Sequence, residues 1–175
     1  MKRLLLSAIC LLFTLLCAAK EITGYVIKVA DGDTITLLDA QKEKQKVRFY
    51  GIDAPESNQA YGKDSGAVLT ELIFHKNVRV EVVNTDVYGR NVGKVYLDDL
   101  YINLEMVKRG CAWYYPQYAP RETDLKDAEA EAREQRLGLW KGRDPMPPWE
   151  FRREKKNNGN KSQKQKKRNI ITIGM

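Results

Sequence analysis

The alternation of apolar and polar residues predicts a mainly β domain that also contains three helices. Five short segments alternate apolar and polar positions or are rich in β-branched residues, as strands are. They are residues 22–29, 34–38, 47–52, 78–83 and 93–97. Three further segments repeat apolar or small residues at helical spacing. They are residues 63–75, 103–110 and 123–136.

The order of these elements favours one architecture. Five short strands with a helix between the third and the fourth match a small Greek-key barrel of the oligonucleotide-binding (OB) type. The predicted fold class is therefore α+β, mainly β: a five-stranded OB-fold barrel with three helices. The same pattern also fits an open α+β sheet. Asn103 is predicted to be the N-cap of the second helix, and Trp140, after the third, is expected in the core.

The two ends of the chain differ in composition from the domain between them. Residues 1–19 combine a basic start, a short apolar run and small residues, which predicts a signal peptide removed on export. The apolar run is short for a membrane span of ~20 residues. Residues 20–150 form the predicted domain, and the Lys-, Asn- and Gln-rich residues 151–175 are predicted to be disordered. We therefore expect a secreted monomer, extracellular or periplasmic, without a membrane anchor after cleavage.

The net charge of +7 belongs to the tail rather than to the domain. Residues 152–168 hold nine Lys and Arg and one acidic residue, while residues 20–151 have a net charge of −3. The net charge of the domain therefore does not imply a generally basic nucleic-acid surface, and any such site requires a local arrangement. The tail is either a salt-sensitive attractor of nucleic acid or a solvated extension. Cys111 is the one cysteine beyond residue 19, so it is expected in the core and without an internal disulfide.

Acidic residues gather around the third predicted strand. Asp53 and Glu56 follow it in the run VRFYGIDAPE, and Asp33 lies in the triplet DGD. In a hairpin whose turn is near residues 42–43, Asp33 faces residue 52 or 53, with Cβ atoms ~4.5–5.5 Å apart. Two carboxylates at that distance repel unless a cation lies between them. Oxygen ligands without His or Cys favour Ca²⁺ or Mg²⁺, although the DGD triplet can also be an ordinary turn.

Phosphate chemistry fits the remaining polar residues of this region. Glu56 follows a proline that restricts its direction, and it can act as a general base or hold the attacking water. Arg48 and Arg90 can bind phosphate oxygens through two parallel hydrogen bonds and neutralise charge in the transition state. The single histidine, His75, matches no motif, so a histidine-based phosphodiesterase is not predicted.

Five motifs occur in an order and spacing that resemble the staphylococcal nuclease (thermonuclease) family. They are VADGDT, VRFYGIDAPE, DVYGR, RGCAWYY and AEAEAREQRLGLW, and the resemblance covers residues 21–140. It implies a five-stranded barrel with three helices. It also implies a Ca²⁺-dependent phosphodiesterase that cleaves DNA and RNA, prefers unpaired strands and leaves 3′-phosphates.

The resemblance also implies roles for individual residues. Metal ligands would be the carboxylates of Asp33 and Asp53 and the backbone carbonyl of Ala54. Catalytic residues would be Arg48, Glu56 and Arg90, and substrate-binding residues would be Asp86, Tyr88, Tyr115 and Tyr118. The two last positions cannot be aligned uniquely, since Tyr114 is also available. Val87 replaces a lysine of the staphylococcal enzyme, which removes one phosphate contact.

A second function class is a non-catalytic nucleic-acid-binding module, because barrels of this type often only bind. A module of that kind is expected to lack part of the Asp, Arg and Glu set. This chain has all five side chains, which favours the enzyme.

Overall fold

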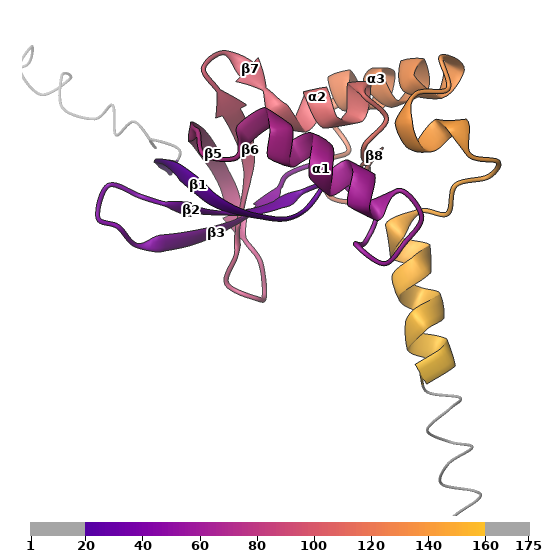
Figure 1. The fold of residues 1–175 in the computed structure, drawn as a ribbon, viewed down its shortest axis with the longest axis horizontal. Coiled ribbons are helices and arrows are strands. Elements are labelled where there is room, and N and C mark those ends of the chain that lie inside the picture. The colour runs from indigo at the N-terminus through magenta and orange to yellow at the C-terminus, as the bar shows by residue number, and fades with distance from the viewer. Residues whose placement is uncertain (1–19, 160–175) are drawn as a thin grey trace, which may run out of the picture.

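Five strands close into a barrel in the computed structural model, which describes residues 20–159 (Figure 1). They are β1 (Glu21–Asp31), β2 (Thr34–Leu38), β3 (Lys44–Phe49), β5 (Asn77–Thr85) and β6 (Asn91–Leu97). Antiparallel pairing gives the order β3-β2-β1-β5-β6, and parallel pairing of β3 with β6 joins the two edges. The predicted barrel is therefore confirmed, and the alternative of an open sheet is wrong because β3 and β6 leave no free edge between them.

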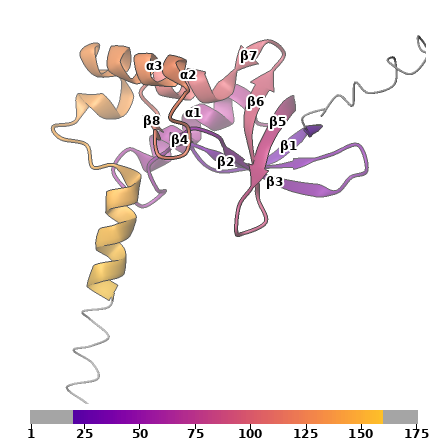
Figure 2. The same cartoon turned by 180° about the vertical axis from the view of Figure 1, so that it is seen from behind.

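Three short strands and the helices lie mainly at one end of this barrel (Figures 1 and 2). β4 (Ile52–Asp53) pairs with β8 (Trp113–Tyr114), and β7 (Leu100–Tyr101) extends β6 as a hairpin. The helices are α1 (Gly62–Ile73), α2 (Ile102–Lys108), α3 (Thr123–Glu134) and the 3₁₀ turn η1 (Gly138–Lys141). α1 packs against β1, and α2 packs against β6 and α3. No helix within residues 20–159 is long and apolar enough to span a bilayer.

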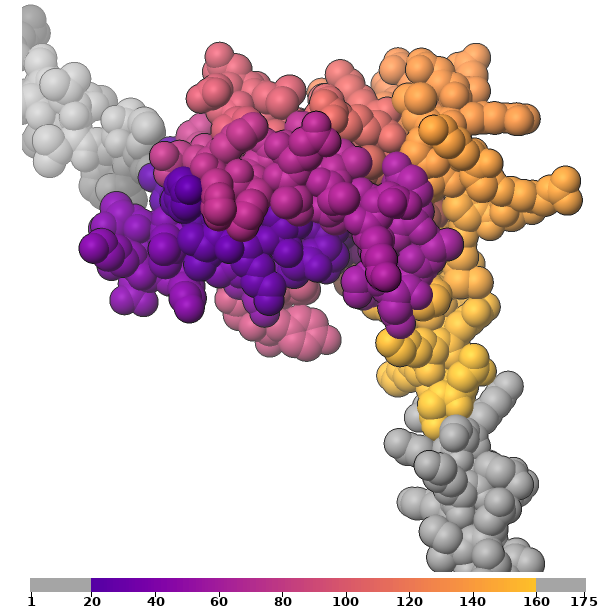
Figure 3. All heavy atoms as spheres, in the orientation of Figure 1, coloured from indigo at the N-terminus to yellow at the C-terminus, as the bar shows by residue number. Residues whose placement is uncertain are grey.

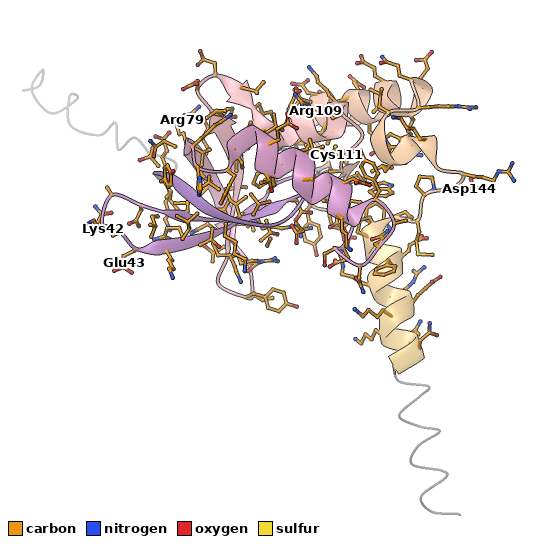
Figure 4. The ribbon with its side chains drawn as sticks, viewed as in Figure 1. Lys42, Glu43, Arg79, Arg109, Cys111 and Asp144 are labelled. Carbon is orange, nitrogen blue, oxygen red and sulfur yellow. The ribbon has the colours of Figure 1, made fainter. Side chains whose placement is uncertain are left out.

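The core follows the alternation seen in the sequence. Val47 and Phe49 of β3 are buried, while Arg48 between them is partly exposed. Cys111 is buried beneath α1, as predicted (Figure 4). Trp140 packs edge to face against Trp113, with ring centroids 5.2 Å apart. The main core joins the barrel to α1, α2 and the start of α3, and Trp113 and Trp140 form a second, smaller cluster with Ala132 and Leu139.

The register of the β2–β3 hairpin differs from the predicted one. Thr34 pairs with Arg48, so the turn is centred near residue 41 rather than residue 42 or 43. The cause is Asp39, whose Oδ1 accepts the N–H groups of Gln41 at 3.0 Å and Glu43 at 2.8 Å. These hydrogen bonds fix the loop between Leu38 and Lys44, whose tip lies far from the helices (Figure 4). The prediction that Asp33 faces residue 52 or 53 across the hairpin is therefore wrong.

Asp53 reaches Asp33 by another path. The chain leaves β3 at Phe49, whose N–H donates to the Asp33 carbonyl oxygen at 2.8 Å, and turns at Tyr50 and Gly51. Gly51 has φ of 76°, and a Cβ there would lie 2.7 Å from Leu125. Glycine tolerates this left-handed conformation without a steric cost. The turn at Tyr50 and Gly51, and not pairing between β2 and β3, therefore brings Asp53 close to Asp33.

Asn103 is not the predicted N-cap. α2 begins at Ile102 after its N-cap Tyr101, two residues before the start that a cap at Asn103 implies, and Asn103 is fully buried. Its Nδ2 donates to the carbonyl oxygens of Tyr50 and Gly93 at 2.9 and 3.2 Å, and its Oδ1 accepts the Val95 N–H at 3.0 Å. Buried polar groups require such partners, so this residue ties β6 to the turn that carries Asp53.

The prediction of disorder from residue 151 onward is wrong for residues 151–159. Residues 148–159 form a helix, called here the C-terminal helix, whose first turns lie beside the segment before α1 (Figure 3). Proline is well tolerated in a first helical turn, and Pro148 is buried there. Trp149 and Arg152 both contact the domain, and these contacts stabilise a segment whose polar composition suggests none. The predicted signal peptide and residues 160–175 lie outside the described part of the chain.

Candidate active site

One cavity of about 570 Å³ collects residues from distant parts of the chain. Its walls come from β3, the segment after it, the β5–β6 loop, the segment after β8 and the C-terminal helix. Seven of the ten predicted site residues line it: Arg48, Glu56, Asp86, Tyr88, Arg90, Tyr115 and Tyr118. The cavity thus has cationic, acidic and aromatic walls.

Two fully buried carboxylates lie behind this cavity. Asp33 and Asp53 each have no exposed surface. Asp33 Oδ2 accepts the Ala54 N–H at 2.5 Å, and its Oδ1 accepts the Thr34 hydroxyl at 3.0 Å. Arg48 joins the pair: its Nη1 lies 2.7 Å from Asp33 Oδ1, and its Nη2 binds Asp53 Oδ1. The sequence predicts a divalent cation between these carboxylates, whereas in the structure the Arg48 guanidinium bridges them.

The electrostatics show that this cluster lacks positive charge. Burial raises the pKa of Asp33 well above its ordinary value, and neighbouring Asp31 and Asp53 raise it further, although Arg48 acts in the opposite direction. Burial alone would lower the pKa of Arg48, but Asp33 and Asp53 outweigh it and raise that pKa. Arg48 therefore stays charged, and with Arg152, which binds Asp53 and Glu56, it supplies two cations against the four acids Asp31, Asp33, Asp53 and Glu56. A further cation would be stabilised here.

The donor set fits a hard cation such as Ca²⁺. All candidate ligands are oxygens, from the carboxylates of Asp33 and Asp53 and the backbone of Ala54, and hard divalent cations prefer oxygen. Among residues 20–159 no group of three or more His, Cys, Asp or Glu is arranged to hold a metal. Two carboxylates fill only part of a shell of six to eight oxygens. Water and a substrate phosphate would have to complete it.

Glu56 and Arg152 form the neighbouring part of the site. The Glu56 side chain is 36% exposed, and its Oε1 binds Arg152 Nη1 at 2.8 Å. Arg152 also binds both oxygens of Asp53, Oδ1 at 3.2 Å and Oδ2 at 2.7 Å. Sequence reasoning missed Arg152 because it lies in the segment assigned to the tail. The aromatic residues Trp149 and Phe151 were the available signal, since large apolar side chains in a polar segment indicate packing.

The β5–β6 loop brings Arg90 to the opposite wall. Asp86 shapes this loop: its Oδ1 accepts the N–H groups of Tyr88 and Arg90, and its Oδ2 binds Arg90 Nε at 2.7 Å. Burial alone would raise the pKa of Asp86, but these hydrogen bonds and the Arg90 charge lower it below the ordinary value. The described contacts of Asp86 thus lie within the loop, where they orient the Arg90 guanidinium. The Tyr88 ring is 81% exposed.

The three candidate tyrosines, Tyr114, Tyr115 and Tyr118, differ in burial and in their surroundings. Tyr114 is buried, and its hydroxyl donates to the Ala119 carbonyl oxygen at 2.8 Å. Tyr115 and Tyr118 line the cavity, with their ring centroids 4.9 Å apart. Trp149 stacks on Tyr115 at 5.0 Å, with the ring planes 2° from parallel. Tyr114 therefore has a structural position, and the other two are placed to meet a ligand.

Comparisons with known proteins show the family of this chain. A family model described as staphylococcal nuclease homologue matches residues 46–142. A Haemophilus influenzae protein named "uncharacterized endonuclease" is 40% identical over 159 residues, covering 90% of this chain and 89% of its own. An Escherichia coli O157:H7 protein of the same name is 43% identical over 143 residues, covering 80% and 90%. A Shigella flexneri protein named "micrococcal nuclease" is 40% identical over 147 residues, covering 78% and 84%. With its five-stranded barrel and this match over more than half its length, the chain belongs to the staphylococcal nuclease family.

Proposed function

We propose that this chain is a calcium-dependent nuclease that hydrolyses phosphodiester bonds of DNA and RNA, prefers single strands and leaves 3′-phosphates. The family match and the relatives named as nucleases make it a phosphodiester hydrolase. The observation that carries the finer proposal is the buried pair Asp33 and Asp53, short of positive charge, beside a cavity lined by Arg48, Glu56 and Arg90.

Ca²⁺ is the proposed cofactor, and Asp33, Asp53 and the Ala54 carbonyl are the residues that would hold it. When bound, it would supply positive charge to the phosphate oxygens as negative charge develops there. Once the two carboxylates are neutralised, the Arg48 guanidinium no longer has to bridge them. Its Nη atoms then become available for a phosphate oxygen in the adjoining cavity.

The proposed chemistry is an in-line attack by water on phosphorus. Glu56 accepts the proton of the attacking water, the bond from phosphorus to the 5′ oxygen breaks, and that oxygen takes a proton from solvent water to leave as the 5′-hydroxyl, which leaves the phosphate on the 3′ side. Arg48 and Arg90 bind the non-bridging oxygens and stabilise the charge of the transition state. A planar guanidinium provides two parallel donors for this purpose, which a lysine cannot.

The preference for single strands is proposed from the aromatic walls. Tyr88 and Tyr118 are 81% and 64% exposed at the mouth of the cavity, next to Arg90 and Tyr115. Unpaired bases can stack on such rings, whereas bases in a duplex are already stacked on each other. We further propose that the protein works as a secreted monomer, extracellular or periplasmic, without a membrane anchor, because residues 1–19 have the composition of a signal peptide.

A nuclease assay on purified protein tests this proposal. Single-stranded DNA, duplex DNA and RNA are incubated with Ca²⁺, with a chelator, and with chelator followed by excess Ca²⁺. We expect cleavage that the chelator abolishes and Ca²⁺ restores, fastest on single strands, with phosphatase-sensitive 3′ ends. Chelator-resistant cleavage would refute the role of the metal. Binding of all three substrates without cleavage would instead indicate a non-catalytic module.

A further inference from the structure

The C-terminal helix places a cation on two acidic residues of the proposed site. Arg152 is the residue concerned, and it engages both oxygens of Asp53 and Oε1 of Glu56. Asp53 is fully buried, and Arg48 also binds its Oδ1. Both Asp53 oxygens therefore already have partners, and the proposed general base is paired as well.

The start of this helix is fixed to the domain, whereas its remainder is not. Pro148 is buried, Trp149 stacks on Tyr115, and the Gln59 side chain donates to the Met146 carbonyl oxygen at 2.6 Å. Residues 153–159 are all exposed and project away from the barrel (Figures 1 and 2). Arg152 is thus close to the last point at which the helix meets the domain, and its side chain can withdraw without unpacking the core.

Competition follows from these contacts. A divalent cation on Asp53 would lie beside the positively charged Arg152 guanidinium, which binds both oxygens of that carboxylate, so its binding is favoured when Arg152 withdraws. In the same way, Glu56 can hold a water or take its proton more readily when Arg152 Nη1 has left. Trp149 likewise covers one face of Tyr115 that a nucleotide base would otherwise reach.

We propose that Arg152 is a built-in competitor that sets the affinity of the site for a divalent cation, and that cation binding displaces its side chain from Asp53 and Glu56. This rests on the proposed cation site. A ligand that must first displace an intramolecular occupant binds with an affinity reduced by the fraction of molecules already open. Removing the occupant therefore raises the affinity, although it removes no ligand of the cation.

Calorimetric titration of metal-free protein with Ca²⁺, without substrate, tests the proposal. Arg152→Gln removes the competing charge, and Arg153→Gln is the matched control because Arg153 is 71% exposed and its recorded ion pair is with Glu150 at 4.0 Å. We expect the dissociation constant for Ca²⁺ to fall about tenfold in Arg152→Gln and to stay at the wild-type value in Arg153→Gln. Thermal unfolding confirms that both variants are folded.

A second measurement follows Trp149, which lies three residues before Arg152 in the same helix. Trp149 is half-buried on Tyr115, whereas Trp113 and Trp140 are buried in the domain. Ca²⁺ should change the tryptophan emission of the wild type, and Trp149→Phe should lose that change.

Three results would overturn the proposal. An equal or weaker Ca²⁺ affinity in Arg152→Gln would show that Arg152 does not compete, and weaker affinity would make it a supporting residue. Unchanged emission in the wild type at saturating Ca²⁺ would show that Arg152 stays in place beside Trp149. Failure of every variant to bind Ca²⁺ would refute the cation site itself, and with it the calcium dependence proposed above.

Discussion

Asn103→Asp is the substitution that best tests how the acidic cluster is assembled. The change keeps the size of the side chain and the oxygen that accepts the Val95 N–H, but it replaces the amide donor by a carboxylate oxygen. That oxygen would face the carbonyl oxygens of Tyr50 and Gly93, to which Asn103 now donates at 2.9 and 3.2 Å. If Asn103 were an N-cap, as the sequence suggests, Asp would replace it at almost no cost.

The expected loss of stability follows from these contacts. Two donated hydrogen bonds contribute about 1 kcal/mol each, and leaving a buried carbonyl and a carboxylate without a donor costs a further ~1–3 kcal/mol. We expect the free energy of unfolding at pH 7 to fall by about 3–5 kcal/mol. The loss should shrink as the pH falls, because protonation of the new carboxyl group restores one donor and removes the buried charge.

Urea denaturation followed by tryptophan fluorescence measures this quantity for wild type, Asn103→Asp and Asn103→Ala. The Ala variant separates the missing bonds from the buried charge, and it should be destabilised without the same dependence on pH. A loss below about 1 kcal/mol for Asn103→Asp at pH 7 would match a tolerated cap residue. It would refute the bridge between α2, β6 and the turn that carries Asp53.

Three further predictions concern the site and its surroundings. Glu56→Gln should keep its fold, because the side chain is partly exposed, and should lose about 10²–10⁴-fold in turnover; a wild-type rate on single-stranded DNA would remove Glu56 as general base. Asp86→Asn should destabilise the protein by about 1 kcal/mol at pH 7. Because folding lowers the pKa of Asp86, its contribution to the free energy of unfolding is fully present above its unfolded pKa of 3.8 and is lost as the pH falls below that value. The difference between variant and wild type in urea denaturation should therefore shrink in acid, and a constant difference would contradict this. Cys111 is 1% exposed, and burial raises its thiol pKa, so in protein without residues 1–19 it should react with a thiol reagent only on unfolding; fast labelling of the native protein would refute this.

The strands of the barrel were predictable from the sequence because the alternation that marks each strand is a property of neighbouring residues. Alternation along β3 places Val47 and Phe49 inside and Arg48 toward the cavity, and side chains on a strand point to opposite faces in turn. Helical spacing likewise located α1 and α3 to within a few residues of their observed ends. The residue types needed for phosphate chemistry were also visible, since motif order and spacing name them without coordinates.

Asn103 and Asp33 show where local information ends. Asn103 has the residue type and position of a cap, yet its partner Tyr50 lies 53 positions away. Asp33 and Asp53 do come together, but a turn at Gly51 and the Arg48 guanidinium join them rather than strand pairing. A hairpin register depends on the side chain of one turn residue, Asp39, and an error of a few positions changes which residues face each other.

The sequence by itself determined the strands, the core and the set of groups that can act on a phosphodiester, because periodicity and motif spacing are properties of neighbouring positions. Only the tertiary structure decided which charges meet. Arg152 binds Asp53 across 99 positions of the chain, from a segment whose composition predicts disorder. A contact of that kind has no local signal, since its energy comes from a buried carboxylate that exists only once the barrel has closed.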